Sequence, residues 1–217
     1  MDFTLSSSDG TAQAPEDYVA LELAIRFSPD NGNRRCLQLT IVDDWRLEDD
    51  EILSLTLTST DPSISLGPGQ SSVTIIDNDQ VTAGLQQAYY TFDETVRQAE
   101  LTVVLLGDVE RDVSVMLESR DGTAIASDED YIAFSEVLIF SRGSNAGSTR
   151  TVTVQILDDP LVERSEFFTA HTSSLDAGVQ IQPGKENVTV YIISDDGKLA
   201  QALNDEPVLC IAIMFVL

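Results

Sequence analysis

The sequence contains few basic residues, one histidine and two cysteines. Its 217 residues include 12 Lys and Arg against 37 Asp and Glu, so the formal net charge is −25. A chain with this charge repels phosphate backbones and acidic lipid surfaces, which argues against nucleic acid as a partner. Two cysteines, Cys36 and Cys210, are too few for a disulfide framework.

Long apolar runs are also lacking. The first ten residues have neither the basic start nor the apolar stretch of a secretory signal peptide. The last ten, Val208 to Leu217, are all apolar, but a membrane-spanning helix needs roughly 20 such residues. This run therefore fits the start of a cut-off membrane segment, a read-through artefact or a short buried strand.

Signatures of catalysis are absent as well. The sequence has no Gly-x-Ser-x-Gly elbow, no cysteine placed with a histidine as a nucleophile, and no cofactor fingerprint. A glycan-cleaving enzyme would need a cleft lined with acids and aromatic rings, and aromatic residues make up only 6% of the chain. We therefore expect that the protein is not an enzyme.

Four short sequence blocks occur twice in the same order. The blocks of the first copy are Asp9-Gly10-Thr11-Ala12, Asp17-Tyr18, Ile41-Val42-Asp43-Asp44 with Glu48 and Glu51, and Ile75-Ile76-Asp77-Asn78-Asp79. Those of the second copy are Asp121-Gly122-Thr123-Ala124, Asp130-Tyr131, Ile156-Leu157-Asp158-Asp159 with Glu163 and Glu166, and Ile192-Ile193-Ser194-Asp195-Asp196. The offset drifts only from 112 to 117 residues, which indicates two copies of one unit that differ by small loop insertions.

These blocks predict a first repeat over residues 1–80, a second over 81–197 and a tail over 198–217. Residues 82–106 of the second copy have no counterpart before Asp9 except the eight residues of the amino terminus. We therefore expect the first copy to lack its first two strands, as in a fragment of a longer chain. An open sheet edge and an uncovered core face would be costly in isolation.

Apolar residues alternate with polar residues between clusters of Gly, Pro, Asn and Asp, a pattern typical of half-buried strands. In the first copy the alternating residues are Ile25 and Phe27, Leu37, Leu39 and Ile41, Leu53, Leu55 and Leu57, and Val73 and Ile75. In the second copy they are Leu101, Val103 and Leu105, Val113, Val115 and Leu117, Leu138 and Phe140, Val152, Val154 and Ile156, and Val190 and Ile192. The pattern predicts an all-β chain of tandem immunoglobulin-like sandwiches, each with about seven antiparallel strands in two packed sheets.

Acidic residues follow the ends of the predicted strands. If neighbouring strand ends meet at one pole of the sandwich, their carboxylates repel one another unless protons or a cation neutralise them. Calcium fits such a rim, since it takes 6 to 8 oxygen ligands and tolerates irregular geometry. Zinc is disfavoured, because His171 is expected on the outer face of a strand and neither cysteine lies near the acids. The alternative is that the acids are strand-end caps and solvated turns, as we expect for Asp9 and Asp121 in their Asp-Gly turns.

The ordered blocks resemble the Calx-beta repeat over nearly all of residues 1–197. The resemblance implies calcium binding at one end of a seven-stranded sandwich. The ligands it implies in the first copy are Asp17, Asp43, Asp44, Glu48, Glu51, Asp77 and Asp79. In the second copy they are Glu94, Asp130, Asp158, Asp159, Glu163, Glu166, Asp195 and Asp196. The chain departs from the best binding pattern at Trp45, Pro160 and Ser194, and the first copy lacks a counterpart of Glu94.

The resemblance implies a calcium-binding structural or adhesive module of a larger extracellular or membrane protein that acts in cell adhesion or communication. Its partners would be calcium ions, neighbouring repeats and a protein partner in adhesion. The alternative is a calcium-sensing regulatory segment of a sodium/calcium exchanger. Asn187-Val188-Thr189 matches the acceptor sequence for N-glycosylation, which has meaning only if the chain is secreted.

Overall fold

The computed structural model describes residues 1–28, 34–160 and 162–196, which divide into two compact units. Unit 1 comprises residues 1–81 with 107–112 and 141–145, and unit 2 comprises residues 82–106, 113–140 and the described residues from 146 onward. The apolar run at 208–217 and Cys210 lie outside the described residues. Within them, no helix is long and apolar enough to cross a membrane.

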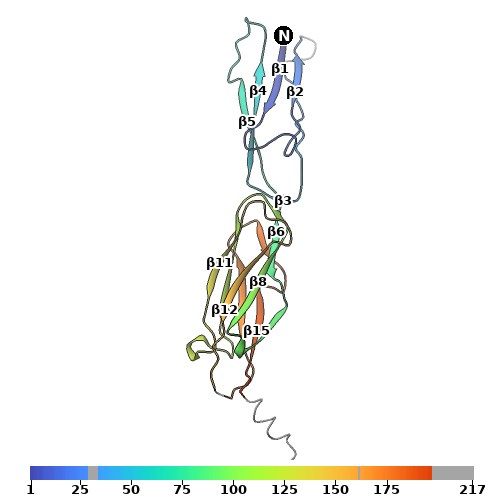
Figure 1. Ribbon diagram of the computed structural model, residues 1–217. Coiled ribbons are helices and arrows are strands. Elements are labelled where there is room, and N and C mark those ends of the chain that lie inside the picture. The colour runs from blue at the N-terminus through green and yellow to red at the C-terminus, as the bar shows by residue number, and fades with distance from the viewer. Residues whose placement is uncertain (29–33, 161, 197–217) are drawn as a thin grey trace, which may run out of the picture. The chain divides into compact units, whose positions relative to one another are not determined.

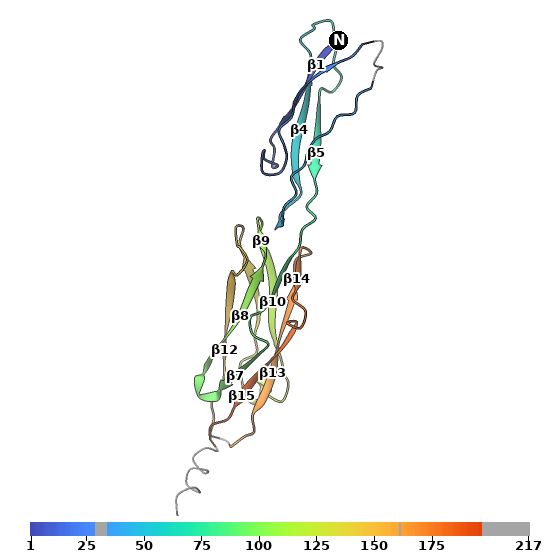
Figure 2. The same ribbon diagram turned by 90° about the vertical axis from the view of Figure 1, so that its right-hand side faces the viewer.

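Unit 2 is a sandwich of a five-stranded and a four-stranded sheet (Figures 1 and 2). Its strands are β6 (Val81–Leu85), β7 (Tyr89–Asp93), β8 (Gln98–Leu106), β10 (Val113–Arg120), β11 (Ser135–Phe140), β12 (Thr149–Gln155), β13 (Glu166–Ser174), β14 (Val179–Ile181) and β15 (Asn187–Ile193). Two short 3₁₀ helices, η2 (Glu94–Val96) and η3 (Ala126–Asp128), interrupt the loops. The strand order is β11-β10-β13-β15-β7 in one sheet and β12-β8-β6-β14 in the other.

The core of unit 2 lies between these sheets. The alternating residues Leu101, Val103 and Leu105 of β8 are fully buried, as are Phe140 and Phe168 from the opposite sheet. The prediction of an all-β, immunoglobulin-like sandwich is therefore confirmed. One detail was wrong: β15 and β7 pair in parallel, not antiparallel. The segment 81–93 forms two short strands in different sheets, and its second strand joins the edge of the five-stranded sheet.

Among its described residues, unit 1 contains a counterpart of the five-stranded sheet of unit 2, hereafter the first sheet, and none of the four-stranded sheet. Its strands are β1 (Asp2–Ser8), β2 (Glu22–Arg26), β3 (Arg46–Leu47), β4 (Glu51–Thr58), β5 (Gln70–Ile75) and β9 (Asp108–Val109). The four-stranded order β2-β1-β4-β5, labelled in Figure 1, repeats the order β11-β10-β13-β15 of unit 2. The register repeats as well, since Leu5 lies opposite Leu57 where Leu117 lies opposite Thr172. Strands β3 and β9 form a separate parallel pair.

The strand predicted around Leu37, Leu39 and Ile41 does not form. This segment makes one isolated bridge, between Ile41 and Tyr18, and the side chains of Leu37 and Ile41 are 41% and 42% exposed. In unit 2 the matching strand β12 pairs with β8 over seven residues. The described residues of unit 1 include no equivalent of β8, so an alternating apolar pattern alone does not produce a ladder here.

Candidate metal centres

The Asp-Gly-Thr-Ala blocks fix the strands that carry Glu51 and Glu166. In unit 2 the amide of Ala124 donates to the carbonyl of Phe167 over 2.9 Å, and the amide of Phe167 donates to Oγ1 of Thr123 over 3.0 Å. Gly122 is required for this approach, because a Cβ at this position would lie 2.4 Å from the carbonyl oxygen of Phe167. The turn therefore holds the first residues of β13 in place.

The same geometry occurs in unit 1. The amide of Ala12 donates to the carbonyl of Ile52, the amide of Ile52 donates to Oγ1 of Thr11, and a Cβ on Gly10 would lie 2.2 Å from that carbonyl oxygen. The repeated block is thus a structural lock beside each acidic site, and its glycine serves close backbone packing.

The aspartates that begin these blocks are structural, as predicted. Oδ1 of Asp121 accepts hydrogen bonds from the amide of Ala126 over 3.1 Å and from the hydroxyl of Tyr131 over 2.6 Å. Asp9 makes the same two bonds, to the amide of Ala14 and the hydroxyl of Tyr18. Burial of Tyr131 and its bond to Asp121 raise the pKa of Tyr131 to about 12. These tyrosines anchor the loops whose preceding residues, Asp17 and Asp130, enter the sites.

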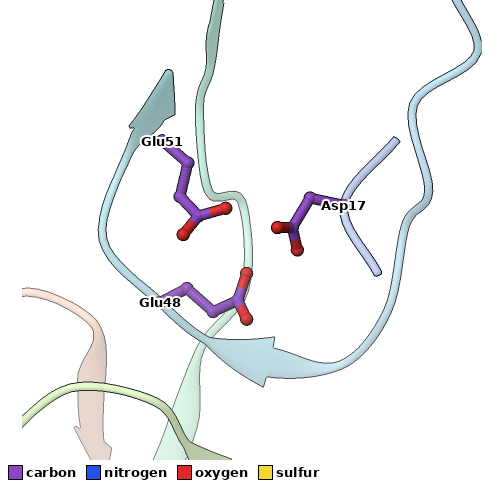
Figure 3. A group of neighbouring side chains, drawn as sticks. All are labelled: Asp17, Glu48 and Glu51. Atoms are coloured by element: carbon purple, nitrogen blue, oxygen red, sulfur yellow. The ribbon is translucent and has the colours of Figure 1, made fainter. Parts of the chain in front are cut away.

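In unit 1, three carboxylates converge from separate elements (Figure 3). Asp17 comes from the loop anchored by Tyr18, Glu48 follows β3, and Glu51 begins β4. One carboxylate oxygen from each lies within 4.8 Å of the others. Asp17 is held in this position by a 2.6 Å hydrogen bond from the amide of Gln13.

This convergence makes the ionised state of the carboxylates in unit 1 unfavourable. Burial, with the nearby charge of Asp44, raises the pKa of Glu48 to about 7 from its ordinary value of 4.5. Burial and the neighbouring Asp17 likewise raise the pKa of Glu51 to about 7. Burial, together with Asp77, raises the pKa of Asp79.

The other acids predicted in the first copy lie around the same pocket without joining the three-residue cluster. They are Asp43, Asp44, Asp77 and Asp79. Oδ1 of Asp44 accepts a 2.8 Å hydrogen bond from the amide of Arg46, and Asp50 accepts one from the amide of Asp77. Asp44 therefore also serves as a local cap, and Asp50, which is not one of the predicted ligands, caps the amide of Asp77.

In unit 2, six of the eight predicted acids form two clusters, which do not include Asp159 and Asp196. Asp130, Glu163 and Glu166 make the first, and Glu94, Asp158 and Asp195 make the second. Within each cluster, one carboxylate oxygen per residue lies within 4.8 Å of the others. Asp130 is held by a 2.7 Å bond from the amide of Ile125, and Glu94, in η2, accepts a 2.9 Å bond from the amide of Asp195. Asp159 lines the pocket of the first cluster.

Burial dominates the electrostatics of these clusters too. Burial and the charge of Asp130 raise the pKa of Glu166 to about 7, and burial with Asp159 raises the pKa of Glu163. Burial also raises the pKa of Glu94, which is only 5% exposed.

Several buried oxygens at these sites have no hydrogen-bond partner. They include Oε2 of Glu51 in unit 1 and Oδ2 of Asp196 in unit 2. A buried carboxylate oxygen without a donor is costly, and each of these atoms borders a group of converging acids. Oxygen donors in irregular clusters suit a hard divalent cation, so the residues present fit calcium.

Two nearby residues escaped the sequence analysis. Arg97 has a left-handed backbone conformation, with φ of 58°, and its guanidinium lies 3.2 Å from Oδ2 of Asp158. Glu129 lines the same pocket as Asp130, Glu163 and Glu166. Glu129 could have been found from the repeat, because Glu16-Asp17-Tyr18 recurs as Glu129-Asp130-Tyr131 and Glu16 lines the pocket of unit 1. The first copy has no counterpart of the segment that carries Arg97, so comparison of the copies could not reveal Arg97.

His171 and Asn187 lie apart from the acids. His171 is between the buried residues Ala170 and Thr172, as predicted, and Nδ1 of His171 is 2.9 Å from Oδ1 of Asn187. The Asn187 side chain is exposed at the start of β15.

Fold and site together define a tandem all-β module in which clusters of acidic residues, the candidate metal centres, lie beside the ends of strands. The Calx-beta domain family model matches residues 1–79 and again residues 77–197. The chain therefore belongs to the Calx-beta domain family and contains two adjacent repeats of it, which confirms the resemblance.

Similar proteins come from two settings. The chain is 27% identical over 202 residues to extracellular matrix protein 3 of Lytechinus variegatus, covering 88% of the chain and 6% of that protein. It is 27% identical over 187 residues to sodium/calcium exchanger 1 of Bos taurus, covering 75% of the chain and 18% of that protein. FRAS1-related extracellular matrix protein 2 of Homo sapiens is 24% identical over 215 residues, covering 88% and 7%. The chain thus spans less than a fifth of each of these relatives.

A solved structure gives the same relationship. The crystal structure of the apo form of the Calx CBD1 domain has 27% sequence identity and a TM-score of 0.50, covering 54% of this chain and all of that one. Calx-beta modules therefore occur among relatives that are extracellular matrix proteins and membrane exchangers.

Proposed function

We propose that this chain is a calcium-binding structural module of an extracellular, multi-repeat adhesion or matrix protein. The observation that carries the proposal is the convergence of carboxylates in both units, beside buried carboxylate oxygens that have no donor. The ligand candidates are the fifteen acids named from the sequence.

The mechanism we propose is stiffening of strand ends. Calcium, when bound, would supply the positive charge that these carboxylates lack. The carboxylate of Asp130 accepts a hydrogen bond from the amide of Ile125, and that of Glu94 in η2 accepts one from the amide of Asp195. Each of these acids is therefore already bonded to the backbone of a different loop. Ligation would hold these loops together and give adjacent repeats a fixed shape, with which the parent protein presents a surface to an adhesion partner. The role is non-enzymatic.

A second candidate is a calcium-sensing regulatory segment of a sodium/calcium exchanger, supported by the 27% identity to exchanger 1. Flanking sequence in the full gene discriminates between the two. An exchanger would have hydrophobic spans on both sides, whereas an adhesion array would continue with further repeats behind a signal peptide.

The first test is thermal unfolding of the whole chain with millimolar calcium and with chelator, together with calcium titration calorimetry. A ligand that binds only the folded state at 100 times its Kd adds about 2.7 kcal/mol to the free energy of unfolding. We expect a higher melting temperature with calcium and a measurable heat of binding. An unchanged melting temperature with no calcium heat would refute the proposal for both units.

Variants assign the effect to each unit. Glu48→Gln should weaken binding in unit 1, and the double change Asp158→Asn with Asp159→Asn should weaken it in unit 2, because the amide keeps the shape and removes the charge. Glu136→Gln is the matched control, since Glu136 is exposed on β11 and belongs to none of the clusters. Equal calcium heats in all of these variants would favour strand-end caps over ligands.

A further inference from the structure

Asn187 is the first residue of β15, and its side chain lies on the outer face of the five-stranded sheet of unit 2. Burial alternates along the strand: Val188, Val190 and Ile192 are buried in the core, whereas Asn187 is exposed. Side chains two residues apart on a strand point to the same face, so the side chain of Thr189 lies on the face of Asn187. Asn187-Val188-Thr189 is the only Asn-x-Ser/Thr triplet among the 217 residues.

The backbone on both sides of Asn187 is hydrogen-bonded. A turn comes just before it, closed by a 2.9 Å hydrogen bond from the amide of Lys185 to the carbonyl of Gln182. Asn187 itself pairs with His171 at the start of the ladder between β13 and β15. The acceptor triplet therefore begins where a turn enters the sheet, and the side chain of its first residue extends outward from that end of the strand.

The carboxamide of Asn187 is bonded through its oxygen and leaves its nitrogen available. Nδ1 of His171 lies 2.9 Å from Oδ1 of Asn187. An amide oxygen can only accept a hydrogen bond, so Nδ1 of His171 carries the proton in this contact. Among the described residues, Nδ2 of Asn187 has no hydrogen-bond partner. A sugar attached to Nδ2 would therefore displace no bond of the fold, and His171 would continue to hold Oδ1.

Asn187 also lies far from the candidate metal centres of its unit. Strand β15 runs from Asn187 to Ile193, and Asp195 of the second cluster follows the end of the strand. At about 3.3 Å per residue, the eight residues from Asn187 to Asp195 span about 26 Å. A bulky group on Asn187 would therefore lie away from the carboxylates.

We propose that Asn187 carries an N-linked oligosaccharide, an inference that rests on the extracellular location proposed above. In the secretory pathway Nδ2 of Asn187 would attack C1 of the first sugar of a lipid-pyrophosphate-linked oligosaccharide, and Thr189 supplies the hydroxyl residue that the acceptor triplet requires. The bond from Nδ2 to C1 forms, the bond from C1 to the pyrophosphate oxygen breaks, the carboxamide loses one proton, and the lipid pyrophosphate leaves. The oligosaccharide would cover the outer face of β15, where Tyr191 is 41% exposed, so a protein partner would bind another face.

The first test is secretion of the whole chain, behind a supplied signal peptide, from cultured animal cells. Mass spectrometry should show a glycan that peptide-N-glycosidase F removes without denaturant, because Asn187 is exposed in the fold. Thr189→Ser keeps the hydroxyl and should keep the glycan, whereas Thr189→Ala should lose it although Asn187 and His171 are unchanged. Asn145 is an internal control, since its side chain is exposed but Gly147 stands two residues later. A secreted chain with bare Asn187, or a glycan released only after denaturation, would overturn the inference and leave the calcium proposal standing.

The second test uses the parent protein, captured from its own tissue with an antibody to this chain. Glycosidase treatment in heavy-oxygen water converts a glycosylated asparagine to an isotope-labelled aspartate, which peptide mass spectrometry locates in the sequence. We expect the label at position 187 and none at Asn145. A bare Asn187 in the native protein, together with a glycosylated Asn187 in the secreted chain, would overturn both this inference and the extracellular location on which it rests.

Discussion

Unit 1 and unit 2 each have their own acidic rim, formed by the converging carboxylates, but they differ in how completely they enclose a core. Their first sheets have the same strand order and register, and the Asp-Gly-Thr-Ala lock and the Asp–Tyr bond occur in both. Unit 2 adds β7 to this sheet and a second sheet of β12, β8, β6 and β14, and its buried residues fill the space between the two sheets. The comparison indicates that the rim is organised by the loops and the first sheet, whereas burial of the core depends on the second sheet.

The largest expected difference lies in the core. Ile156→Ala in unit 2 should lower the free energy of unfolding by about 2–5 kcal/mol, because Ile156 is fully buried and leaves a cavity. Ile41→Ala, at the matching position of unit 1, should cost only about 0.5 kcal/mol, because the side chain is 42% exposed. Urea unfolding followed by NMR signals of each unit measures both. Equal losses would show that residues 34–41 are covered in solution.

Disrupting the Asp-Gly-Thr-Ala turn should lower the free energy of unfolding by similar amounts in both units. Gly122→Ala and Gly10→Ala each place a methyl group within 2.4 Å of a backbone carbonyl oxygen, which should cost about 1–3 kcal/mol through forced displacement. Gly67→Ala is the control, since a Cβ there meets nothing within 4 Å. Thermal unfolding provides the measurement. A loss in one unit alone would mean that the two turns are not equivalent.

In the absence of metal, the free energy of unfolding should change more steeply with pH in unit 1 than in unit 2. Its Glu48 and Glu51 have pKa values raised to about 7, against one such residue, Glu166, in unit 2. A raised carboxyl pKa means that the folded state holds the proton more tightly. The resulting stability is fully present below the unfolded value of about 4.5 and is lost as pH rises through about 7.

Melting of each unit in chelator at pH 5 and pH 7.5, followed by NMR, tests this difference. The double change Glu48→Gln with Glu51→Gln should flatten the profile of unit 1 and leave that of unit 2 unchanged. A steeper profile in unit 2 would contradict the prediction.

The smallest expected effect belongs to Arg97. Its guanidinium pairs with Asp158 near the candidate site, so removal of its charge should strengthen calcium binding in unit 2. The Arg97 side chain is 75% exposed, and exposed ion pairs contribute at most about 1 kcal/mol, which corresponds to about fivefold in Kd.

Calorimetry of Arg97→Gln measures this change. Arg120→Gln is the control, because Arg120 pairs with Glu118 outside the clusters. Calcium binding in unit 1 should not change, since the first copy lacks the segment that carries Arg97. Weaker binding in Arg97→Gln would show that the arginine supports the site.

The sequence by itself determined the repeat, the all-β class and the placement of acids at strand ends. These features follow from local patterns: apolar residues alternate along each strand, and repeated blocks preserve spacing. The blocks also identified Asp9 and Asp121 as structural, because an aspartate before glycine caps its own turn. The gathering of Asp130, Glu163 and Glu166 could be anticipated because adjacent strand ends meet at one edge.

Tertiary structure decided the rest. The division of the second copy's acids into two clusters, the parallel pairing of β7 with β15, and the approach of Arg97 to Asp158 depend on contacts between residues far apart in the chain. Residues 37–41 show the reason most clearly. Their alternation matches that of β12, yet a strand is defined by hydrogen bonds to a neighbouring strand, and the alternation of apolar residues carries no information about that neighbour.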